Sequence, residues 1–385
     1  MDFVRLPVSD RAVRLNRRVE RALNFAVRTC DRVLGRVGLG GREANYDDER
    51  YEFVGGPGDH LRRRHYDRSL HLLWKAEEHA PHLPFQDCTD AERSLLDMAV
   101  RSLTQEERAA RRRLSAPEFR ALLDREYTRR EKEALVGVLS AIGHGEAYAW
   151  IVSAALLAEV KSTGARAALT MQVVEEAKHF IVLRELLQAF DVPIPRQSVW
   201  EYLFMEGVLR APGVERLYGM NVLVEGIALS LFGLLSELPG LEVLRLFHLD
   251  ESRHTGLPGN YLKEFPLTAW QRRSPLARTR RLCMALPALA LMPHLEEDLA
   301  VLGIDAFEFG GSVMRKITLL AERNGFLLPV PRATLLRAIN AGFNGYCRLT
   351  RPAHVFRDFV RAEATRGERE LAVEEQIFAA QSASA

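Results

Sequence analysis

Apolar residues recur at the 3.6-residue period of an α-helix along most of this 385-residue chain. Strands would instead show alternating apolar and polar residues in runs rich in Val, Ile and Thr, bounded by turn residues. Such runs are nearly absent here. The helical pattern is sharpest between residues 131 and 262. The sequence therefore predicts an all-α fold in which long helices bury apolar stripes.

Turn signals divide residues 131–262 into segments. They are STG (162–164), DVPIP (191–195), APG (211–213) and LPG (238–240). We expect long helices at about 131–161, 165–190, 214–238, and from the last turn to near GLPG (256–259). The stretch SVWEYLFMEGVLR, between the second and third, is expected to be a shorter helix. Two helical hairpins joined by a long crossover form one kind of four-helix bundle.

Two flanking regions, 1–130 and 263–385, are expected to be helical extensions of a central unit at 131–262. The first is rich in arginine and is broken at VGLGG and at two later irregular stretches that end near residue 90. The second contains the apolar run LCMALPALALMP (282–293), a helix that should end at Gly325, and a tail, AAQSASA, that should be disordered. The apolar run is too short to span a bilayer, so we interpret it as a buried helix.

Composition limits which binding partners and which cellular compartment we expect for the protein. The net charge is +2, which gives no reason to expect nucleic acid as a partner. The four cysteines are far apart and form no C-x-x-C pair, so a zinc ribbon and a rubredoxin-type iron site are not expected. The N-terminus lacks the apolar region of a secretory signal. A cytoplasmic protein without a transmembrane segment fits these features best.

Two short motifs carry the chemistry. EEAKH (175–179) and DESRH (250–254) each contain Glu-x-x-His, as Glu176/His179 and Glu251/His254. Residues three apart share a helix face, so each pair can direct a carboxylate and an imidazole at one point. Both pairs lie on stripes of apolar residues. Buried carboxylates need a cation or a proton, because an unpaired buried charge is costly.

Each motif has a glutamate on the preceding helix. Glu146 lies on an apolar stripe of the first helix, and Glu225 lies in the almost uncharged stretch NVLVEGIALS of the third. A turn near residue 238 is equally far from Glu225 and Glu251, so an antiparallel hairpin brings them level. In the first hairpin, a turn near 163 offsets Glu146 from Glu176 by about four residues, roughly 6 Å along the axis.

The order Glu, Glu-x-x-His, Glu, Glu-x-x-His on four consecutive helices resembles the ferritin-like carboxylate-bridged di-iron family. The resemblance covers about 131–262 and implies a ferritin-like four-helix bundle. It also implies that Glu176 and Glu251 bridge two metal ions, with one histidine, His179 or His254, on each. Glu146 and Glu225 would supply the remaining carboxylates. This ligand set suits two Fe ions, or a Mn/Fe pair, better than copper or zinc-thiolate chemistry.

Several nearby residues have a second interpretation. His248 is an additional candidate ligand, as in di-iron arylamine N-oxygenases, but it lies one residue away from their register and also fits a core histidine. Glu175 and Asp250 are expected either to be solvated or to support ligands, rather than to bind metal. Glu159 is a weak rival of Glu146, and Tyr148 is more readily explained by packing than by radical chemistry. Gly143 and Gly145 either ease helix packing or leave room for a substrate.

The resemblance implies an enzyme, an O2-activating non-heme di-iron oxidase or monooxygenase. Its substrate would be a small hydrophobic or aromatic molecule, and the reaction hydroxylation, desaturation, N-oxygenation or C–C cleavage. Without a C-x-x-C domain of its own, it would take electrons from a separate ferredoxin or reductase. A homodimer would be compatible with such an enzyme. The alternatives are a ferroxidase or metal-storage protein, and a non-catalytic helical scaffold whose carboxylates pair with arginine.

Overall fold

The structure, a computed structural model, describes residues 3, 5–36, 114, 116–161 and 163–351. All secondary-structure elements in these residues are helices, which confirms the all-α prediction. The breaks expected between residues 37 and 90, and the C-terminal tail, lie outside the described residues.

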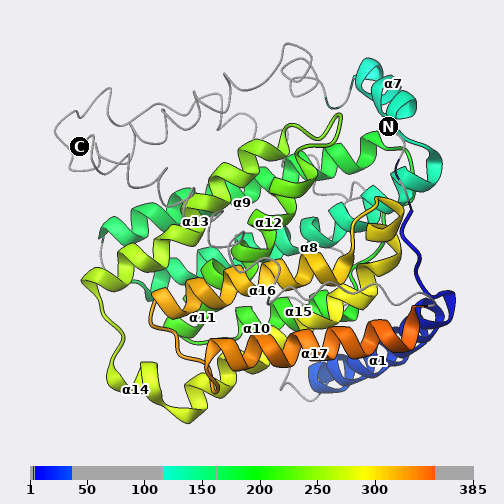
Figure 1. The fold of residues 1–385 in the computed structure, drawn as a ribbon. Coiled ribbons are helices and arrows are strands. Elements are labelled where there is room, and N and C mark those ends of the chain that lie inside the picture. The colour runs from blue at the N-terminus through cyan, green and yellow to red at the C-terminus, as the bar shows by residue number, and fades with distance from the viewer. Residues whose placement is uncertain (1–2, 4, 37–113, 115, 162, 352–385) are drawn as a thin grey trace, which may run out of the picture.

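Four helical segments form the centre of the molecule. They are α8 (Arg129–Glu159), α9 (Thr163–Ala189), a composite third segment, and α13 (Leu244–Glu264). The composite segment comprises α11 (Val214–Tyr218), η3 (Gly219–Val224) and α12 (Glu225–Leu235). α8 packs on α9 and α12 on α13, and contacts of α9 with α13 and of η3 with α8 join the two hairpins (Figure 1).

The ends of α8 explain how the first hairpin is aligned. Thr128 caps the helix start, because its side chain accepts a hydrogen bond from the Glu131 N–H while the Glu131 carboxylate accepts one from the Thr128 N–H. The helix ends at Glu159, slightly before the predicted end, and α9 begins at Thr163. Residue 161 is then midway between the helices and also midway between Glu146 and Glu176. The predicted offset between Glu146 and Glu176, which assumed a turn near residue 163, is therefore absent.

The third segment is not the single α-helix that the sequence predicts. Six residues, Gly219–Val224, form a π-helix between α11 and α12. Its wider turn contains Asn221, whose side chain is fully buried and hydrogen-bonds to two other helices. π-helical turns of this kind often occur beside functional sites. Here it directly precedes Glu225.

The fourth helix continues beyond its predicted end at GLPG. α13 runs to Glu264 with Pro258 inside it. Proline has no N–H, so the carbonyl of His254, four residues earlier, loses its normal helical donor. The Asn221 side-chain nitrogen lies 3.1 Å from that carbonyl and donates to it instead. This contact between two helices compensates for the helix-breaking residue, a compensation that local sequence cannot reveal.

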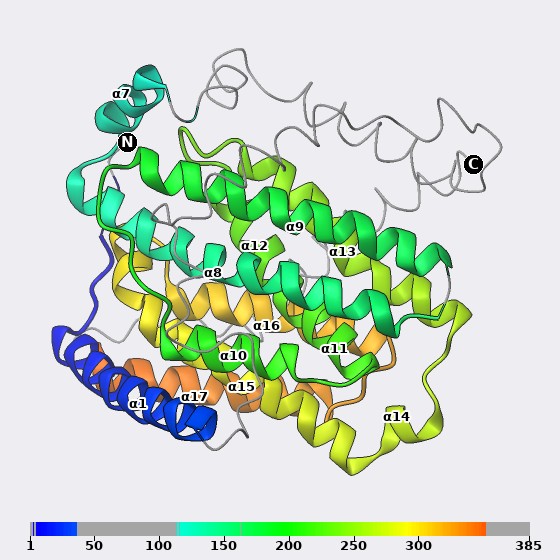
Figure 2. The same ribbon diagram turned by 180° about the vertical axis from the view of Figure 1, so that it is seen from behind.

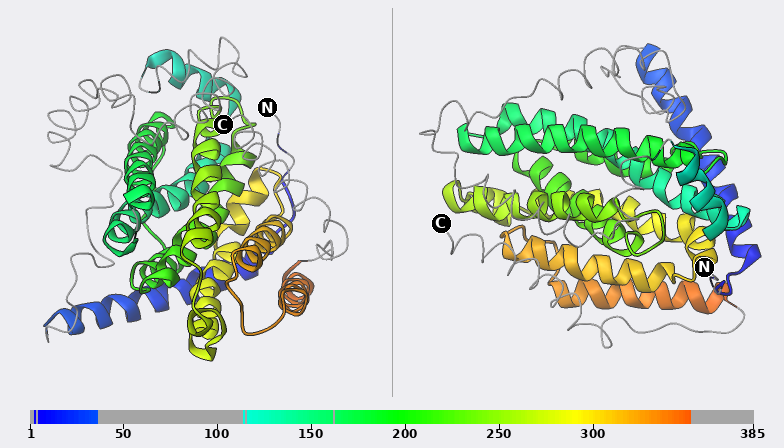
Figure 3. Two further views of the ribbon diagram at one scale, coloured as in Figure 1. Left: turned by 90° about the vertical axis from the view of Figure 1, so that its left-hand side faces the viewer. Right: turned by 90° about the horizontal axis from the view of Figure 1, so that it is seen from above.

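A second group of helices packs on η3 and α12 and on the face of α8 beside them. It comprises α10 (Val199–Leu209), α15 (Pro275–Val301) and α16 (Ala306–Arg323). The predicted helices at SVWEYLFMEGVLR and LCMALPALALMP are thus confirmed, and so is the end of α16, where Gly325 has a φ of 74°. In Figure 3, α16 and the α8–α9 hairpin lie on opposite sides of α13.

The remaining helices lie on the outside. α17 (Arg332–Thr350) packs on α16, and α1 (Asp10–Arg36) packs on α15 and α10. Figure 2 shows α1 and α17 together along one edge, joined by a 2.8 Å hydrogen bond from Asn16 to the Tyr346 hydroxyl. The short α7 (Pro117–Glu126) and α14 (Ala269–Arg273) lie at opposite ends.

Two large clusters of buried apolar side chains hold the helices together. One gathers around η3, α10, α15 and α16, and the other around α7, the first half of α8, α9, α12 and α13. α15 contributes to both, through Met284 and Met292 in the first and Leu295 and Leu299 in the second. The C-terminal helices therefore share their core with the four central segments.

Two helices are long and apolar enough to cross a membrane by length and composition, Arg129–Glu159 and Val214–Leu235. Most of each apolar window, 72% and 78%, is buried inside the protein, as is usual for core helices. Each also carries one buried carboxylate of the cluster described next, Glu146 or Glu225.

Candidate metal centre

The six predicted ligand residues come together between the four central segments. Two groups of four are close enough to hold an ion each, with their ligand atoms within 4.8 Å of one another. The first group is Glu146, Glu176, His179 and Glu251, and the second is Glu176, Glu225, Glu251 and His254. Glu176 and Glu251 belong to both. The structure thus places these two carboxylates in both groups, with one further carboxylate and one histidine on either side.

His179 directs its Nδ1 atom at the first group. This nitrogen lies 3.1 Å from Glu251 Oε1, 3.3 Å from Glu146 Oε2 and 3.7 Å from Glu176 Oε2. The ring also stacks on Phe247, with centroids 4.2 Å apart. Side chains from three helices therefore converge on one nitrogen, and an aromatic neighbour fixes the plane of its ring.

His254 occupies the corresponding place in the second group. Its Nδ1 atom lies 3.0 Å from Glu251 Oε2, 3.2 Å from Glu176 Oε1 and 3.4 Å from Glu225 Oε1. Each shared glutamate thus turns one oxygen toward each histidine. A carboxylate oriented in this way can bridge two cations.

Burial sets the electrostatics of the cluster. Burial, reinforced by the neighbouring carboxylates Glu176 and Glu251, raises the pKa of Glu146 and of Glu225 well above its ordinary value. Burial also acts to raise the pKa of Glu251, but the attraction of His254 and hydrogen bonds outweigh it and lower that pKa. Without a cation, the surroundings therefore favour the protonated form of Glu146 and of Glu225 and the ionised form of Glu251.

For the two histidines, the neighbouring charges outweigh the effect of burial on the pKa. Burial lowers the pKa of an imidazole, but the surrounding carboxylates outweigh it and raise the pKa of both His179 and His254 well above the usual value. Bound protons therefore compensate the negative charge of the site when no metal is present.

Open acceptor atoms show that the cluster fits a cation. Glu176 Oε2 and Glu251 Oε1 are buried and have no well-aligned hydrogen-bond donor among the described residues, although His179 Nδ1 lies 3.7 and 3.1 Å from them. Leaving a buried carboxylate oxygen without a donor is costly, so such atoms usually have a function. Both belong to the shared glutamates. Carboxylate oxygens and imidazole nitrogens are common ligands of divalent metal ions, so each of the two groups could hold a metal ion.

The outer nitrogen of each histidine is held by a carboxylate from the opposite motif. His179 Nε2, on α9, lies 3.0 Å from Asp250 on α13, and His254 Nε2, on α13, lies 2.8 Å from Glu175 on α9. A donor bond from Nε2–H leaves Nδ1 free to bind a metal. Of the two roles expected for Asp250 and Glu175, the structure therefore favours support of the histidines, and each carboxylate contacts the histidine of the other helix.

Two cations that the sequence analysis did not select anchor these supporting carboxylates. Arg253 pairs with Glu175 and lies 2.8 Å from Asp250, and Lys178 lies 3.2 Å from Asp250. Burial acts to raise the pKa of Asp250, but its hydrogen bond to His179 and the charge of Lys178 outweigh it and lower that pKa. Lys178 lies within EEAKH and Arg253 within DESRH. Their place in the two motifs was the only feature of the sequence that could have predicted this anchoring role.

The sequence analysis also missed two buried amide side chains, Gln172 and Asn221. Gln172, one turn before Glu176, donates to Glu225 Oε1 at 2.7 Å and to Glu176 Oε1 at 3.3 Å. Asn221 donates to the Gln172 oxygen at 2.8 Å. This chain links the π-helix to two carboxylates of the cluster. Neutral amides on apolar helices give little signal in a sequence, because their partners are on other helices.

Other candidates lie outside both ligand groups. His248 donates from Nδ1 to the Leu229 carbonyl at 2.9 Å, which is the arrangement of a satisfied core histidine. Glu159 pairs with Arg216 at 2.6 Å near the end of α8. Tyr148 is buried in an apolar cluster. The structure does not bring these three residues into the group of six.

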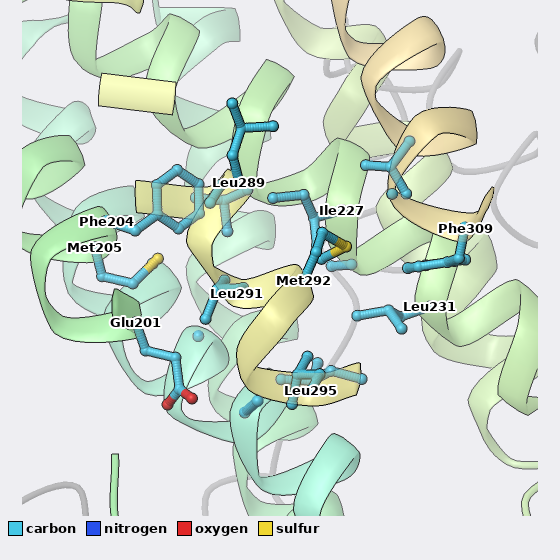
Figure 4. Close-up of a pocket in the computed structure, with 18 of the residues that line it drawn as sticks. Glu201, Phe204, Met205, Ile227, Leu231, Leu289, Leu291, Met292, Leu295 and Phe309 are labelled. Atoms are coloured by element: carbon cyan, nitrogen blue, oxygen red, sulfur yellow. The ribbon is translucent and has the colours of Figure 1, made fainter. Parts of the chain in front are cut away.

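A small apolar cavity lies against the cluster. It has a volume of about 70 Å³ and is lined by residues of α8, α10, η3, α12, α15 and α16, including Glu146 and Gly145. Figure 4 shows the apolar part of the lining, with Met205, Leu291 and Leu295 among its side chains. A Cβ atom placed on Gly145 would meet nothing within 4 Å. Of the two roles considered for Gly145, the structure therefore favours leaving room beside Glu146.

No known protein family, curated protein or solved structure matches this chain. The arrangement itself thus carries the functional argument. It is an all-α protein with two adjoining, buried Glu/His groups that could each hold a metal ion.

Proposed function

We propose that this protein is an O2-activating non-heme di-iron oxidase or oxygenase built on a ferritin-like four-helix bundle. In this proposal α8, α9, η3–α12 and α13 are the four helices of the bundle. The observation that carries it is the pair of buried ligand groups that share Glu176 and Glu251 and adjoin an apolar cavity. A homodimer and a cytoplasmic location belong to the same proposal.

Two iron ions held by the six residues would supply the electrons that reduce O2. The residues of the chain position and protect that chemistry. His179 and His254 offer Nδ1 because Asp250 and Glu175 hold the opposite ring nitrogen. Gln172 orients the Glu225 carboxylate. The apolar cavity wall excludes water and admits a small hydrophobic substrate beside Glu146.

The charge distribution favours a metal over the scaffold alternative. A scaffold would pair its buried carboxylates with arginine or lysine. Within the described ranges, the only cationic side chains within 4 Å of the four clustered glutamates are histidines. Arg253 and Lys178 pair with the supporting carboxylates instead.

Metal content tests the proposal directly. The protein is expressed with ample iron, and bound metals are counted by elemental analysis. We expect about two Fe per chain, or one Fe and one Mn, in the natural protein. The double variant His179→Ala/His254→Ala should lose most of it. His248→Ala, on the same helix as His254 but outside the ligand groups, is the matched control and should keep its metal.

The outcomes separate the three hypotheses. Iron far beyond two ions per chain, in a large hollow assembly, would support the storage alternative. Protein that stays metal-free after anaerobic reconstitution with Fe(II) would favour the scaffold. With two ions bound, O2 consumption by the reduced protein, with a ferredoxin or reductase as electron donor, is the next measurement.

A further inference from the structure

The outer side of α1 concentrates positive charge. Its 27 residues include eight arginines and three acidic residues, although the whole chain has a net charge of only +2. At about 3.6 residues per turn, five of the arginines fall on one side of the helix. All five are exposed, and none has an acidic partner among the described residues. This arginine stripe consists of Arg11, Arg14, Arg18, Arg32 and Arg36.

The opposite side of α1 holds the helix to the rest of the protein. The Glu20 carboxylate lies 2.9 Å from His294 Nδ1 of α15. The Asp31 carboxylate accepts a hydrogen bond from the Tyr202 hydroxyl of α10, and Asn16 donates one to α17. Because these contacts all lie on one side, the arginine stripe is turned away from the helices that hold α1.

Apolar side chains accompany the arginines on this exposed surface. Phe25 lies within the arginine stripe and is 74% exposed, and Leu15, Val19 and Val33 are exposed along its flank. Single exposed apolar residues are common on protein surfaces. Here, however, they are aligned with a row of arginines along one helix. Arginine together with exposed Phe and Leu is the pattern of helices that lie in the plane of a membrane surface.

A second group of this kind lies on the same side of the molecule. Trp270 of α14 is 72% exposed, and Leu276 at the start of α15 is also exposed. Residues 265–295 include five arginines and no acidic residue, and Arg272 and Arg273 are exposed beside Trp270. In Figures 1 and 2 and in the left-hand view of Figure 3, α1 and α14 both lie on the lower side. Tryptophan is enriched where proteins meet the membrane–water boundary.

The combination of positive charge and apolar side chains selects the partner. A second copy, bound by a two-fold contact, would set the arginines of both chains against each other. Nucleic acid offers negative charge but no apolar phase for Phe25 and Trp270. Residues 37–113, which follow α1, carry 15 acidic and 13 basic residues and so have little excess charge to neutralise the arginine stripe. An anionic bilayer offers negative charge at its surface and hydrocarbon just beneath it.

We propose that the arginine stripe and the exposed apolar residues of α1 and α14 form a surface that binds the protein peripherally to membranes containing anionic lipids. α1 lies along the bilayer surface, with its arginines at the lipid phosphates and Phe25 below them at the boundary with the hydrocarbon. Such attachment is reversible and agrees with the proposed cytoplasmic location. The proposal goes beyond the proposed function and does not depend on the metal centre.

Vesicle binding tests the proposal in the full-length protein. Co-sedimentation is measured with vesicles of phosphatidylcholine alone and with vesicles of equal parts phosphatidylcholine and phosphatidylglycerol. We expect the anionic vesicles to bind the protein at least about tenfold more tightly, and the binding to weaken as salt is added. Absence of binding, or equal binding to both vesicles, would overturn the proposal. So would tighter binding to a DNA duplex than to the anionic vesicles at the same ionic strength.

Charge variants assign the binding to the arginine stripe. Arg14→Gln/Arg18→Gln removes two exposed charges and should weaken binding to anionic vesicles by about tenfold or more. Arg120→Gln/Arg125→Gln removes two exposed arginines of α7, at the other end of the molecule from α14, and is the matched control. It should change binding by no more than about twofold. Equal losses in both variants would show that only the total charge matters and would contradict the assignment.

A fluorescent variant tests whether the apolar residues enter the bilayer. The emission of Phe25→Trp, compared with that of the natural protein, should shift to shorter wavelengths when anionic vesicles are added, and lipids brominated in their acyl chains should quench it. Phe25→Ser should weaken binding to these vesicles by about fivefold, because less apolar area is buried. An indole emission that stays at its position in water, without quenching, would reject the proposed contact with the bilayer.

Discussion

Asn221 donates a hydrogen bond to the main-chain carbonyl of His254, the group that Pro258 leaves without a helical donor. The contact joins the π-helix to α13 one turn before the proline. It allows α13 to continue past GLPG. It also fixes the backbone of a candidate ligand from a neighbouring helix.

Removal of the Asn221 amide should destabilise the fold in a way that depends on Pro258. Asn221→Ala leaves the His254 carbonyl unsatisfied, at a cost of about 1–3 kcal/mol in the free energy of unfolding. In a Pro258→Ala background, the restored N–H satisfies that carbonyl, so the same substitution should cost less. The four proteins form a double-mutant cycle measured by urea unfolding. Purely additive effects would show that the two residues act independently.

The crossed carboxylates should control metal affinity. Asp250→Asn and Glu175→Gln each weaken the hold on one histidine, and we expect each to lower metal affinity by about 10–100-fold. Competition with a chelator of known affinity measures the change for Mn(II). Glu133→Gln, which removes a half-exposed carboxylate elsewhere on α8, is the control. Affinities equal to that of the control would mean that Asp250 and Glu175 serve only the fold.

Metal binding should become tighter as pH rises. In the metal-free protein, burial raises the pKa of Glu146 and of Glu225, and the carboxylates raise the pKa of His179 and of His254. These groups hold protons that an incoming cation must displace, so a lower proton concentration favours binding. Calorimetry in two buffers of different ionisation enthalpy counts the protons released. Binding without proton release would show that the free site is already deprotonated.

Two glycines of α8 should respond oppositely to alanine. Gly145 faces open space, so Gly145→Ala should stabilise the protein by about 0.5–1 kcal/mol through higher helix propensity. A Cβ atom on Gly137 would collide with the Asp298 carboxylate, so Gly137→Ala should destabilise by about 1 kcal/mol. Thermal unfolding of both variants measures the difference. The same sign for both would mean that propensity outweighs the local packing.

Some of these features could be predicted because they are local. Helical periodicity is a property of neighbouring residues, and it located the central helices. The spacing within Glu176/His179 and Glu251/His254 places each pair on one helix face whatever surrounds it. The hairpin turns brought Glu146 and Glu225 level with them. The candidate ligand set and the all-α class therefore follow from sequence.

Tertiary structure decided the contacts between helices, because these contacts depend on how separate helices are rotated and aligned. Asp250 supports His179 and Glu175 supports His254 only because α9 and α13 lie side by side with their motifs level. Pro258 is tolerated only because Asn221 reaches the freed carbonyl. The cavity beside Glu146 is lined by α10, α15 and α16, which carry none of the six candidate ligands, together with α8, η3 and α12, so it exists only through the packing of these helices. Sequence alone determined which side chains share a helix face, and the packing of the helices determined which of them meet.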